Sequence, residues 1–298
     1  MDKLTGVQEN INLNIDIMNN VTNSLSIVAT PIGNLEDISY RAVNVLKKCD
    51  LIICENPKHS LKLLNKLGIK KKLFALHDYN EEKIIVQIKS LLQNKNCVLI
   101  SDAGSPLISD PGYNLEQYCI KNKIKLTSIP GPSSIISSLQ LSGLPLSEFT
   151  FFGFLPKSKK KLEELVKKLP QEKRTSVFFV SNHKLLIFIE MLEKFIPERQ
   201  ISICKELTKL NEFVFRGLSS KVKNDILQKK ENLKGEFVAV VGGQTQKSQV
   251  FDDIELYRIE LKKLSTKFSL TDIVEIVHKF TKINKNKIYK WLLNLKKK

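Results

Sequence analysis

One twelve-residue stretch, Ser101 to Gly112, concentrates side chains and backbone freedom suited to binding a polar ligand. It reads Ser-Asp-Ala-Gly-Ser-Pro-Leu-Ile-Ser-Asp-Pro-Gly. Its glycines let the backbone approach a ligand closely or adopt a positive φ, and its prolines stiffen the loop. An ordinary turn capped by the aspartates is the alternative for any single residue. The density of such residues favours the wall of a ligand pocket.

The residues before this stretch predict its position in the fold. Cys97-Val98-Leu99-Ile100 is a short apolar run that enters a Gly/Pro/Ser/Asp cluster, as is typical of a buried strand ending in a loop. Ligands of open α/β sheets bind at the carboxyl ends of the strands. We therefore expect the stretch at that edge of a sheet.

Short apolar runs alternate with amphipathic segments along the first half of the chain. Asp37 or Ser39 is a suitable helix cap, and residues 81–93 place their apolar side chains on one helical face. The alternation predicts βαβ units and a largely parallel sheet. The expected strands are 25–29, 51–54, 73–76, 97–100 and 125–129, and the expected helices are 39–48, 61–67, 81–93, 115–121 and 135–141.

Glycines and prolines between Gly143 and Pro156 are interpreted as a domain boundary, after which the alternation restarts. The expected later strands are 176–180, 201–206, 213–216 and 237–241, and the expected helices are 159–169, one capped by residues 181–183 that ends near residue 195, 222–228, 271–280 and 285–295. The predicted organisation is a polar tail (1–23) in which alternating isoleucines allow a strand, a first α/β domain (24–145), a second α/β domain (146–245) and a small basic helical unit (250–298).

The chain of 298 residues is strongly basic, with 48 Lys and Arg against 31 Asp and Glu and a net charge of +17. Such a charge favours a polyanionic partner, with nucleic acid first among them. Lysine greatly outnumbers arginine, and drift toward A/T-rich codons explains the high positive charge equally well. Local clusters are therefore more informative, namely Lys157–Lys161 and residues 261–298. The second cluster contains eleven lysines and only two acidic residues, Asp272 and Glu275.

Several classes of protein are disfavoured. No run reaches the length of a transmembrane helix, and residues 1–23 lack the apolar core of a secretory signal. The five cysteines are scattered without a Cys-x-x-Cys pair, which favours buried thiols in the cytosol and no metal site. Gly-x-Gly-x-x-Gly, P-loop and Gly-x-Ser-x-Gly motifs are absent, so nicotinamide dehydrogenases, P-loop enzymes and α/β-hydrolases are disfavoured.

Five strand-end loops together carry a resemblance to a known family: residues 29–35 (Ala-Thr-Pro-Ile-Gly-Asn-Leu), 101–112, 130–133 (Pro-Gly-Pro-Ser), 153–156 (Gly-Phe-Leu-Pro) and 206–209 (Glu-Leu-Thr-Lys). The chain resembles the tetrapyrrole-methylase superfamily, class III S-adenosylmethionine-dependent methyltransferases, over residues 24–243. It is most similar to the branch that methylates a cytidine 2′-hydroxyl in the decoding region of 16S rRNA in the small ribosomal subunit. The resemblance implies two α/β domains with the donor in the cleft between them, and a homodimer in the cytoplasm. The chain after residue 250 is similar to the small C-terminal helical region of many members.

Carried over position by position, the resemblance implies a set of residues that bind S-adenosylmethionine. They are Asp102, Ala103, Gly104, Ser105, Pro106 and Ile108 from the first loop, Pro130, Gly131, Pro132 and Ser133 from the next, and Ser181, Asn182, His183 and Ala239 from the second domain. No metal is implied.

Methyl transfer to a hydroxyl needs alignment of the reacting atoms and removal of a proton. Candidates for the base are Glu206, Asp102, Glu55 and His59, with Glu206 preferred and a strand-end salt bridge to Lys209 as its equal alternative. A role as donor ligand or loop cap is favoured for Asp102, and a role as helix-start residue is favoured for His59. Asn34 is a second catalytic candidate that could hydrogen-bond ribose or cytosine, with a turn-forming role as the alternative. The lysines expected to contact RNA are Lys58, Lys157, Lys209, Lys285 and Lys290.

The chain departs from the family at two places. It reads Asn56-Pro57-Lys58-His59 where many members have Asp-Thr-Arg-His, and Val180-Ser181-Asn182-His183-Lys184 where many have Glu-Ser-Pro-His-Arg. Lysine keeps the charge of arginine and loses its bidentate geometry. Two alternative functions follow: a porphyrinoid C-methyltransferase of the same fold, and a non-catalytic RNA-binding assembly factor.

Overall fold

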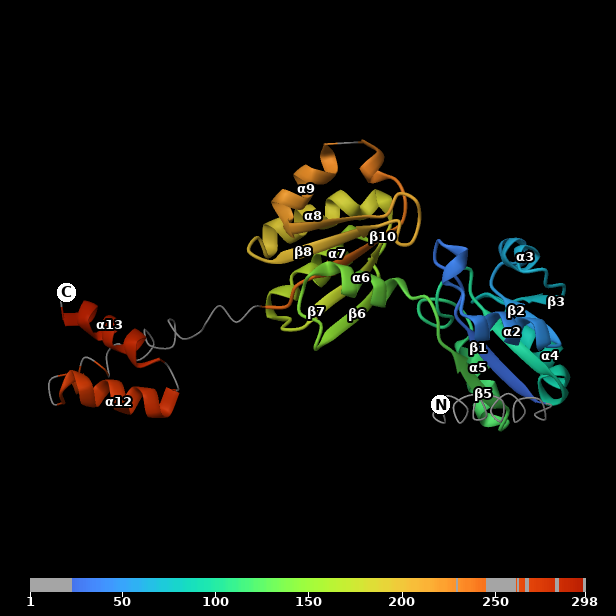
Figure 1. Ribbon diagram of the computed structural model, residues 1–298, viewed down its shortest axis with the longest axis horizontal. Helices are drawn as coiled ribbons and strands as arrows, with labels where there is room; N and C mark the ends of the chain where they lie inside the picture. Colours follow the sequence, from blue (N-terminus) through green and yellow to red (C-terminus); the bar gives the residue numbers. More distant parts are fainter. Residues whose placement is uncertain are drawn as a thin grey trace, which may run out of the picture. The chain divides into compact units, whose positions relative to one another are not determined.

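A computed structural model describes residues 23–228, 230–244, 261, 263–265, 268–281 and 284–296. The chain divides into two compact units, Met1–Gly243 and Gln244–Lys298, which are described separately (Figure 1). The polar tail and its possible strand, expected within residues 1–23, lie outside the described residues except for Asn23. In the described part of the chain, no helix is long and apolar enough to cross a lipid bilayer.

The first sheet is entirely parallel, as expected, with strand order β3-β2-β4-β1-β5. Helices α2 and α3 pack against one face, and α4 and α5 pack against the other. This division follows from right-handed crossovers, because the chain moves one way from β1 to β3 and the other way from β3 to β5. The elements are β1 (Ser24–Val28), η1 (Leu35–Asp37), α2 (Tyr40–Lys48), β2 (Leu51–Cys54), α3 (Pro57–Lys66), β3 (Lys72–Ala75), α4 (Glu81–Asn94), β4 (Asn96–Ile100), α5 (Tyr113–Lys121) and β5 (Lys125–Ile129).

The centre of this sheet is a topological switch point. Strands β1 and β4 are neighbours, yet the chain leaves them in opposite directions, toward β2 and toward β5. A crevice opens at the carboxyl ends of two such strands. The loops that begin at Ala29 and at Ser101 therefore lie side by side at this edge.

The second sheet is mixed, with strand order β6-β7-β10-β8-β9, and only β6 and β7 are parallel. Strands β8 and β9 are joined by residues 206–212, too short for a crossover helix, so they form an antiparallel hairpin. The elements are α6 (Ser134–Ser142), β6 (Phe149–Phe154), α7 (Lys159–Val166), η2 (Leu169–Gln171), β7 (Thr175–Val180), α8 (Asn182–Phe195), β8 (Gln200–Lys205), β9 (Phe213–Leu218), α9 (Ser219–Leu227), η3 (Lys230–Leu233) and β10 (Phe237–Val241).

Residues 143–156, which were interpreted as a domain boundary, also contain strand β6. Its pairing with β7 shifts register between Phe151 and Phe154, and Gly153 between them has φ +73°. An irregularity with a glycine at positive φ interrupts the alternation that marks a regular strand. The glycine therefore indicated a bulge within a strand.

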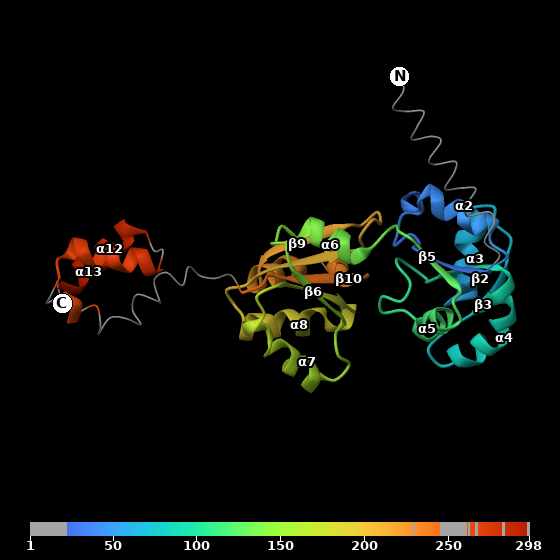
Figure 2. The ribbon, with the colours of Figure 1, turned by 90° about the horizontal axis from the view of Figure 1, so that it is seen from below.

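Helix α6 packs against the second sheet. Its Leu139 shares a buried cluster with Val177, Cys204 and Val238, while α7, α8 and α9 cover the opposite face (Figure 2). The division at residues 145 and 146 stays a prediction, since residues up to 243 form one compact unit. Helix α6 was expected in the first domain, but it packs against the second sheet.

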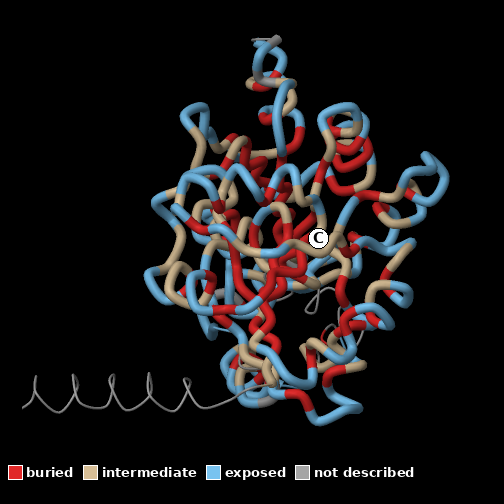
Figure 3. Tube along the Cα trace, turned by 90° about the vertical axis from the view of Figure 1, so that its right-hand side faces the viewer, coloured by how far each residue is buried: buried red, intermediate tan, exposed pale blue. Residues whose placement is uncertain are grey.

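Buried and exposed stretches alternate along the trace (Figure 3), and most buried hydrophobic residues belong to strands and helices. Strands β2 and β10 are buried along their whole length. The five cysteines are free and buried, as their apolar surroundings in the sequence predict.

The second unit contains α12 (Leu270–Thr281) and α13 (Lys285–Lys296), close to the two expected helices. Their apolar faces pack together through Ile273, Val277, Ile288 and Leu292, each buried. The unit therefore has a small core of its own.

Candidate active site

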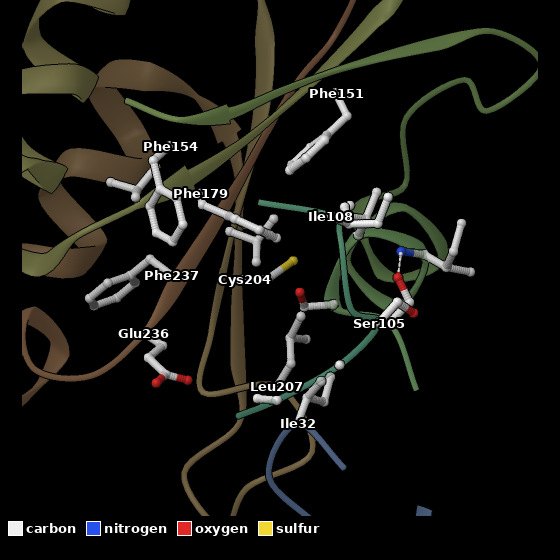
Figure 4. A pocket seen from close by; sticks show the side chains of 18 of the residues that line it. Ile32, Ser105, Ile108, Phe151, Phe154, Phe179, Cys204, Leu207, Glu236 and Phe237 are labelled. Atoms are coloured by element: carbon white, nitrogen blue, oxygen red, sulfur yellow. Dashed lines mark hydrogen bonds between the residues drawn. The ribbon is translucent and has the colours of Figure 1, made fainter. Parts of the chain in front are cut away.

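A cavity of about 750 Å³ lies where the carboxyl edge of the first sheet faces the second sheet (Figure 4). It is large enough for a cofactor-sized ligand. The loop after β4, the starts of α6 and α8, and strands β6, β7, β8 and β10 all contribute to it. The lining residues are Ile32, Asp102, Ala103, Gly104, Ser105, Ile108, Asp110, Ser133, Ser134, Ile135, Ile136, Phe149, Phe151, Phe154, Phe179, Val180, Ser181, Asn182, Cys204, Leu207, Gly235, Glu236, Phe237 and Val238.

The loop after β4 is held in an uncommon backbone conformation. The N–H of Gly104 donates to the carbonyl of Thr30 at 3.0 Å, and the N–H of Thr30 donates to the carbonyl of Gly104 at 2.8 Å. Gly104 has φ +77°, and two residues that are not glycine, Leu107 and Ser109, have φ +73° and +67°. Such angles cost energy for residues with a Cβ and are frequent at ligand-binding sites.

Two carboxylates of this loop face the cavity. The Oδ1 atom of Asp102 is buried and, among the described residues, has no hydrogen-bond partner. Burial raises the pKa of Asp110 to about 6; the charges of Glu55 and Asp102 add to the rise, and a hydrogen bond from Ser101 opposes it. A buried, unpartnered carboxylate oxygen is costly. This part of the cavity therefore favours a ligand that carries a positive charge or hydrogen-bond donors.

Aromatic side chains form the opposite wall, which sequence reasoning missed. Phe151 and Phe154 of β6 pack edge-on against Phe179 of β7, with ring centroids 4.9 and 5.1 Å apart (Figure 4). Burial raises the pKa of the Cys204 thiol to about 11, so this neighbouring side chain stays neutral. The alternation of Phe149, Phe151 and Gly153 was the available signal, and it lay within the stretch interpreted as a boundary.

Two helices begin at the cavity. Ser133 caps α6 by accepting a hydrogen bond from the N–H of Ile136 at 3.5 Å. Ser181 precedes α8, and its hydroxyl lies 3.4 Å from Nε2 of His183. Helix N-termini present backbone donors to polar or anionic ligand groups.

Most of the predicted donor-binding residues line the cavity, and some do not. The structure brings together Asp102, Ala103, Gly104, Ser105, Ile108, Ser133, Ser181 and Asn182, whereas Pro106, Pro130, Gly131, Pro132, His183 and Ala239 are not among the lining residues.

Ala239 is not a lining residue, and its contact with the donor stays a prediction. It is fully buried in the core on the α8 side of β10, while its neighbour Val238 lines the cavity. Successive side chains of a strand point to opposite faces, so a shift of one residue changes the face.

The two predicted catalytic residues do not line the cavity. Oε1 of Glu206 accepts hydrogen bonds from Nζ of Lys209 at 3.1 Å and from the N–H of Glu236 at 2.8 Å. Burial raises the pKa of Glu206, but these two donors outweigh it and hold the pKa below its usual 4.5. The salt bridge, weighed as the alternative, is what this geometry favours, and a catalytic role for Glu206 stays a prediction.

Asn34 has a local structural role. Its Oδ1 atom accepts a hydrogen bond from the N–H of Glu36 at 3.0 Å and caps η1, and its own N–H donates to Oγ1 of Thr208 at 3.0 Å. This is the turn-forming alternative, and its contact with substrate stays a prediction.

A second cavity of about 460 Å³ adjoins the first. The two share Ile32, Asp102, Ala103 and Glu236. The remaining residues that line the second cavity are Pro31, Gly33, Leu35, His59, Lys62, Leu63, Lys66 and Lys209.

The lysines expected to bind RNA differ in their surroundings. Lys58, Lys157 and Lys290 are exposed. Lys209 is ion-paired to Glu206 and Glu236, and Lys285 is ion-paired to Glu275. Their contacts with RNA stay predictions.

The two departures from the family motifs preserve local structure. Oδ1 of Asn56 accepts hydrogen bonds from the N–H groups of Lys58 and His59 at 3.1 and 3.4 Å and so caps α3. Nζ of Lys184 donates to the carbonyls of Leu155 and Pro156 at 3.1 and 2.7 Å. These residues therefore still serve as a helix cap and as a link to the end of β6.

Comparison with known proteins identifies a matching family model and related proteins. Residues 24–223 match the family model for tetrapyrrole (corrin/porphyrin) methylases. Ribosomal RNA small subunit methyltransferase I of Pasteurella multocida (strain Pm70) is 37% identical, and the match covers 92% of this chain and 98% of that protein. The protein of the same name from Thermotoga maritima is 42% identical, covering 74% of this chain and 98% of that protein.

Solved structures share the fold. Diphthine synthase has a TM-score of 0.58 at 16% identity, covering 75% of this chain and 91% of that chain. Uroporphyrin-III-C-methyltransferase from Thermus thermophilus has a TM-score of 0.52 at 19% identity, covering 74% and 94%. The chain belongs to the tetrapyrrole methylase family, whose members take the transferred methyl group from S-adenosylmethionine.

Proposed function

We propose that this chain transfers a methyl group from S-adenosylmethionine to the 2′-hydroxyl of a cytidine in the decoding region of 16S rRNA. The observation that carries the proposal is the cavity formed by residues 101–112 and the starts of α6 and α8. It occurs in a chain that is similar over 92% of its length to a protein named as a small-subunit rRNA methyltransferase. The substrate is then the small ribosomal subunit, in the cytoplasm, and we expect the enzyme to act as a homodimer.

The lining of the cavity fits the donor. A volume of about 750 Å³ accommodates a nucleoside with an amino-acid side chain. The aromatic wall suits the adenine ring, and the buried carboxylate oxygen of Asp102 suits a positively charged group. Ser133, Ser181 and Asn182 offer hydrogen bonds at helix starts. When bound, the donor supplies an electrophilic methyl group on a positively charged sulfur.

The contribution of the protein is then positional and electrostatic. The loop after β4 is held in place by its pairing with Thr30 and so can position the donor. The apolar wall of β6 and β7 is suited to exclude water from the reacting atoms. A hydroxyl acceptor must also lose its proton to a nearby base. Correct alignment of such groups lowers the barrier without new covalent chemistry in the protein.

The test is methylation in vitro with labelled donor and small subunits from a strain that lacks the modification. We expect label on a cytidine ribose in the decoding region after nuclease digestion. Label on base carbon, on protein or on an added porphyrinoid contradicts the proposal. Calorimetry with S-adenosylmethionine separates the non-catalytic alternative, which predicts no donor binding.

A further inference from the structure

Helix α3 presents three basic or titratable side chains to the second cavity. His59, Lys62 and Lys66 are spaced i, i+3 and i+7, which places them on one face of the helix, and all three line the cavity of about 460 Å³. Within the described part of the chain, no ion pair involves Lys62 or Lys66. Lysines in a concave site are suited to bind phosphate.

The second cavity adjoins the first, in which we place S-adenosylmethionine. Asp102 and Ala103 line both, as do Ile32 and Glu236. A molecule in the second cavity therefore lies against the group held in the first. This is the arrangement that a transfer between two substrates needs.

His59 and Asp102 form a pair at this junction. Nδ1 of His59 lies 3.7 Å from Oδ1 of Asp102, the oxygen that is buried without a hydrogen-bond partner among the described residues. The side chain of His59 is 51% exposed, so the ring remains accessible from the cavity. A carboxylate beside Nδ1 favours the tautomer with the proton on Nδ1, which leaves Nε2 free to accept a proton. Catalytic hydrogen bonds are often long before substrate binds and shorten in the complex.

We infer that the second cavity holds the acceptor nucleotide, with His59 as the base for its hydroxyl and with Lys62 and Lys66 as ligands of the adjacent phosphate. This inference rests on the proposed function. In the step, the O–H bond of the acceptor breaks and its proton passes to Nε2 of His59. The hydroxyl oxygen forms a bond to the methyl carbon, and the carbon–sulfur bond breaks with its electron pair going to sulfur. His59 then releases the proton to water.

Charged side chains from several elements surround His59. Carboxylates of Glu55, Asp102 and Glu236 face it from the ends of β2, β4 and the loop before β10, and Lys62, Lys66 and Lys209 face it from α3 and the loop after β8. Lys209 is paired to Glu206 and Glu236. Carboxylates and lysines are therefore equal in number around His59.

The first test uses His59→Ala and a pH series with the full chain and saturating substrates. We expect the rate to fall at least about 100-fold, the usual contribution of a general base. The wild-type rate should rise with pH when a base must be free to accept the proton, and the rise that depends on residue 59 should be absent in the variant. Added imidazole should restore part of the rate. Affinity for the subunit, measured without donor, should stay within threefold.

The second test uses the pair Lys62→Ala/Lys66→Ala. We expect at least tenfold weaker binding of small subunits and a salt slope reduced by about two, because each phosphate contact contributes nearly one unit. Donor affinity should be unchanged. Lys83→Ala/Lys89→Ala is the matched control, since these exposed lysines lie on α4, on the opposite face of the first sheet.

The outcomes separate this inference from the proposed function. If the wild type produces 2′-O-methylcytidine while His59→Ala stays within threefold at every pH, His59 is not the base. If the Lys62/Lys66 variant matches its control in affinity and salt slope, the acceptor site lies elsewhere. If the wild type places label on another atom, the proposed function itself fails.

Discussion

Gly104 adopts φ +77° where the loop after β4 pairs with Thr30. A Cβ there would meet Cγ2 of Ile32 at an ordinary 3.4 Å, so conformation and not space is the constraint. A β-branched residue at this φ is strained, and Gly104→Val should cost about 1–2 kcal/mol of stability. We expect at least tenfold weaker donor binding by calorimetry, because the loop must shift to relieve the strain.

Gly68 provides the control for this substitution. It has φ +68° with open space around the added Cβ, and it is not among the residues lining either cavity. Gly68→Val should lose similar stability and keep the donor affinity of the wild type. A Gly104→Val protein whose donor affinity is within threefold of wild type would show that Gly104 serves only the turn.

Asp110 makes stability depend on pH in a direction that follows from its environment. Burial raises its pKa from 3.8 to about 6, so the folded chain keeps a proton that the unfolded chain has lost between these values. Stability therefore falls as pH rises through this window, and the cost is fully present above pH 6. Asp110→Asn removes this titration. Denaturant unfolding should show the variant gaining stability relative to wild type from pH 4.5 to pH 7.5, and an equal difference at both pH values contradicts the assignment.

At the scale of elements, Arg199 connects the ends of several segments of the second sheet. Its guanidinium donates to the carbonyls of Leu169, Pro170, Glu172 and Gly242 at 2.8–3.3 Å. Lysine cannot reproduce this planar set of donors. Arg199→Lys should leave part-buried carbonyls unpaired and cost about 2–4 kcal/mol in the free energy of unfolding.

Arg174→Lys is the comparison for this prediction. Arg174 is half exposed and ion-paired to Glu172, so the same substitution should cost less than about 1 kcal/mol. Chemical denaturation of both variants measures the difference. Equal losses would mean that the four carbonyls are satisfied without the guanidinium.

The first sheet was predictable from sequence because its strands are short apolar runs separated by capped, amphipathic helices, as with β2 and α4. The second sheet was harder for physical reasons. The hairpin of β8 and β9 has no helix between its strands, and the bulge at Gly153 hides β6. Loop length and a glycine at positive φ decide such features, and neither is visible in hydrophobic periodicity.

The candidate site was predictable where contiguous motifs supply it, as at Asp102 to Ser105 and at Ser133. It was not predictable where strand register decides which side chain faces the cavity, as with Val238 in place of Ala239. The pair of His59 and Asp102 joins the ends of two neighbouring strands, β2 and β4. Both residues were candidates in the sequence, and only the fold brings them together.

At the scale of the molecule, the lysines behind the net charge of +17 form local groups with different expected roles. Lysines line the second cavity, where we infer that the acceptor binds, while residues 261–298 carry eleven lysines against two acidic residues in a separate compact unit. In that unit, Lys279 and Lys290 are exposed, whereas Lys285 is ion-paired to Glu275. The exposed lysines are suited to hold phosphate, which carries no sequence information.

Deletion of Gln244–Lys298 tests this division. The remaining chain keeps both sheets and both cavities, so donor affinity and the modified nucleotide should not change. Binding to small subunits should weaken, and its salt dependence should flatten by at least two units, because each lost phosphate contact removes about 0.7–0.9 unit. Lys279→Ala/Lys290→Ala in the full chain controls for loss of the helices and should flatten the slope by less. An unchanged affinity and slope after deletion would mean that this unit does not anchor RNA, and modification of a different nucleotide would mean that it also directs the site.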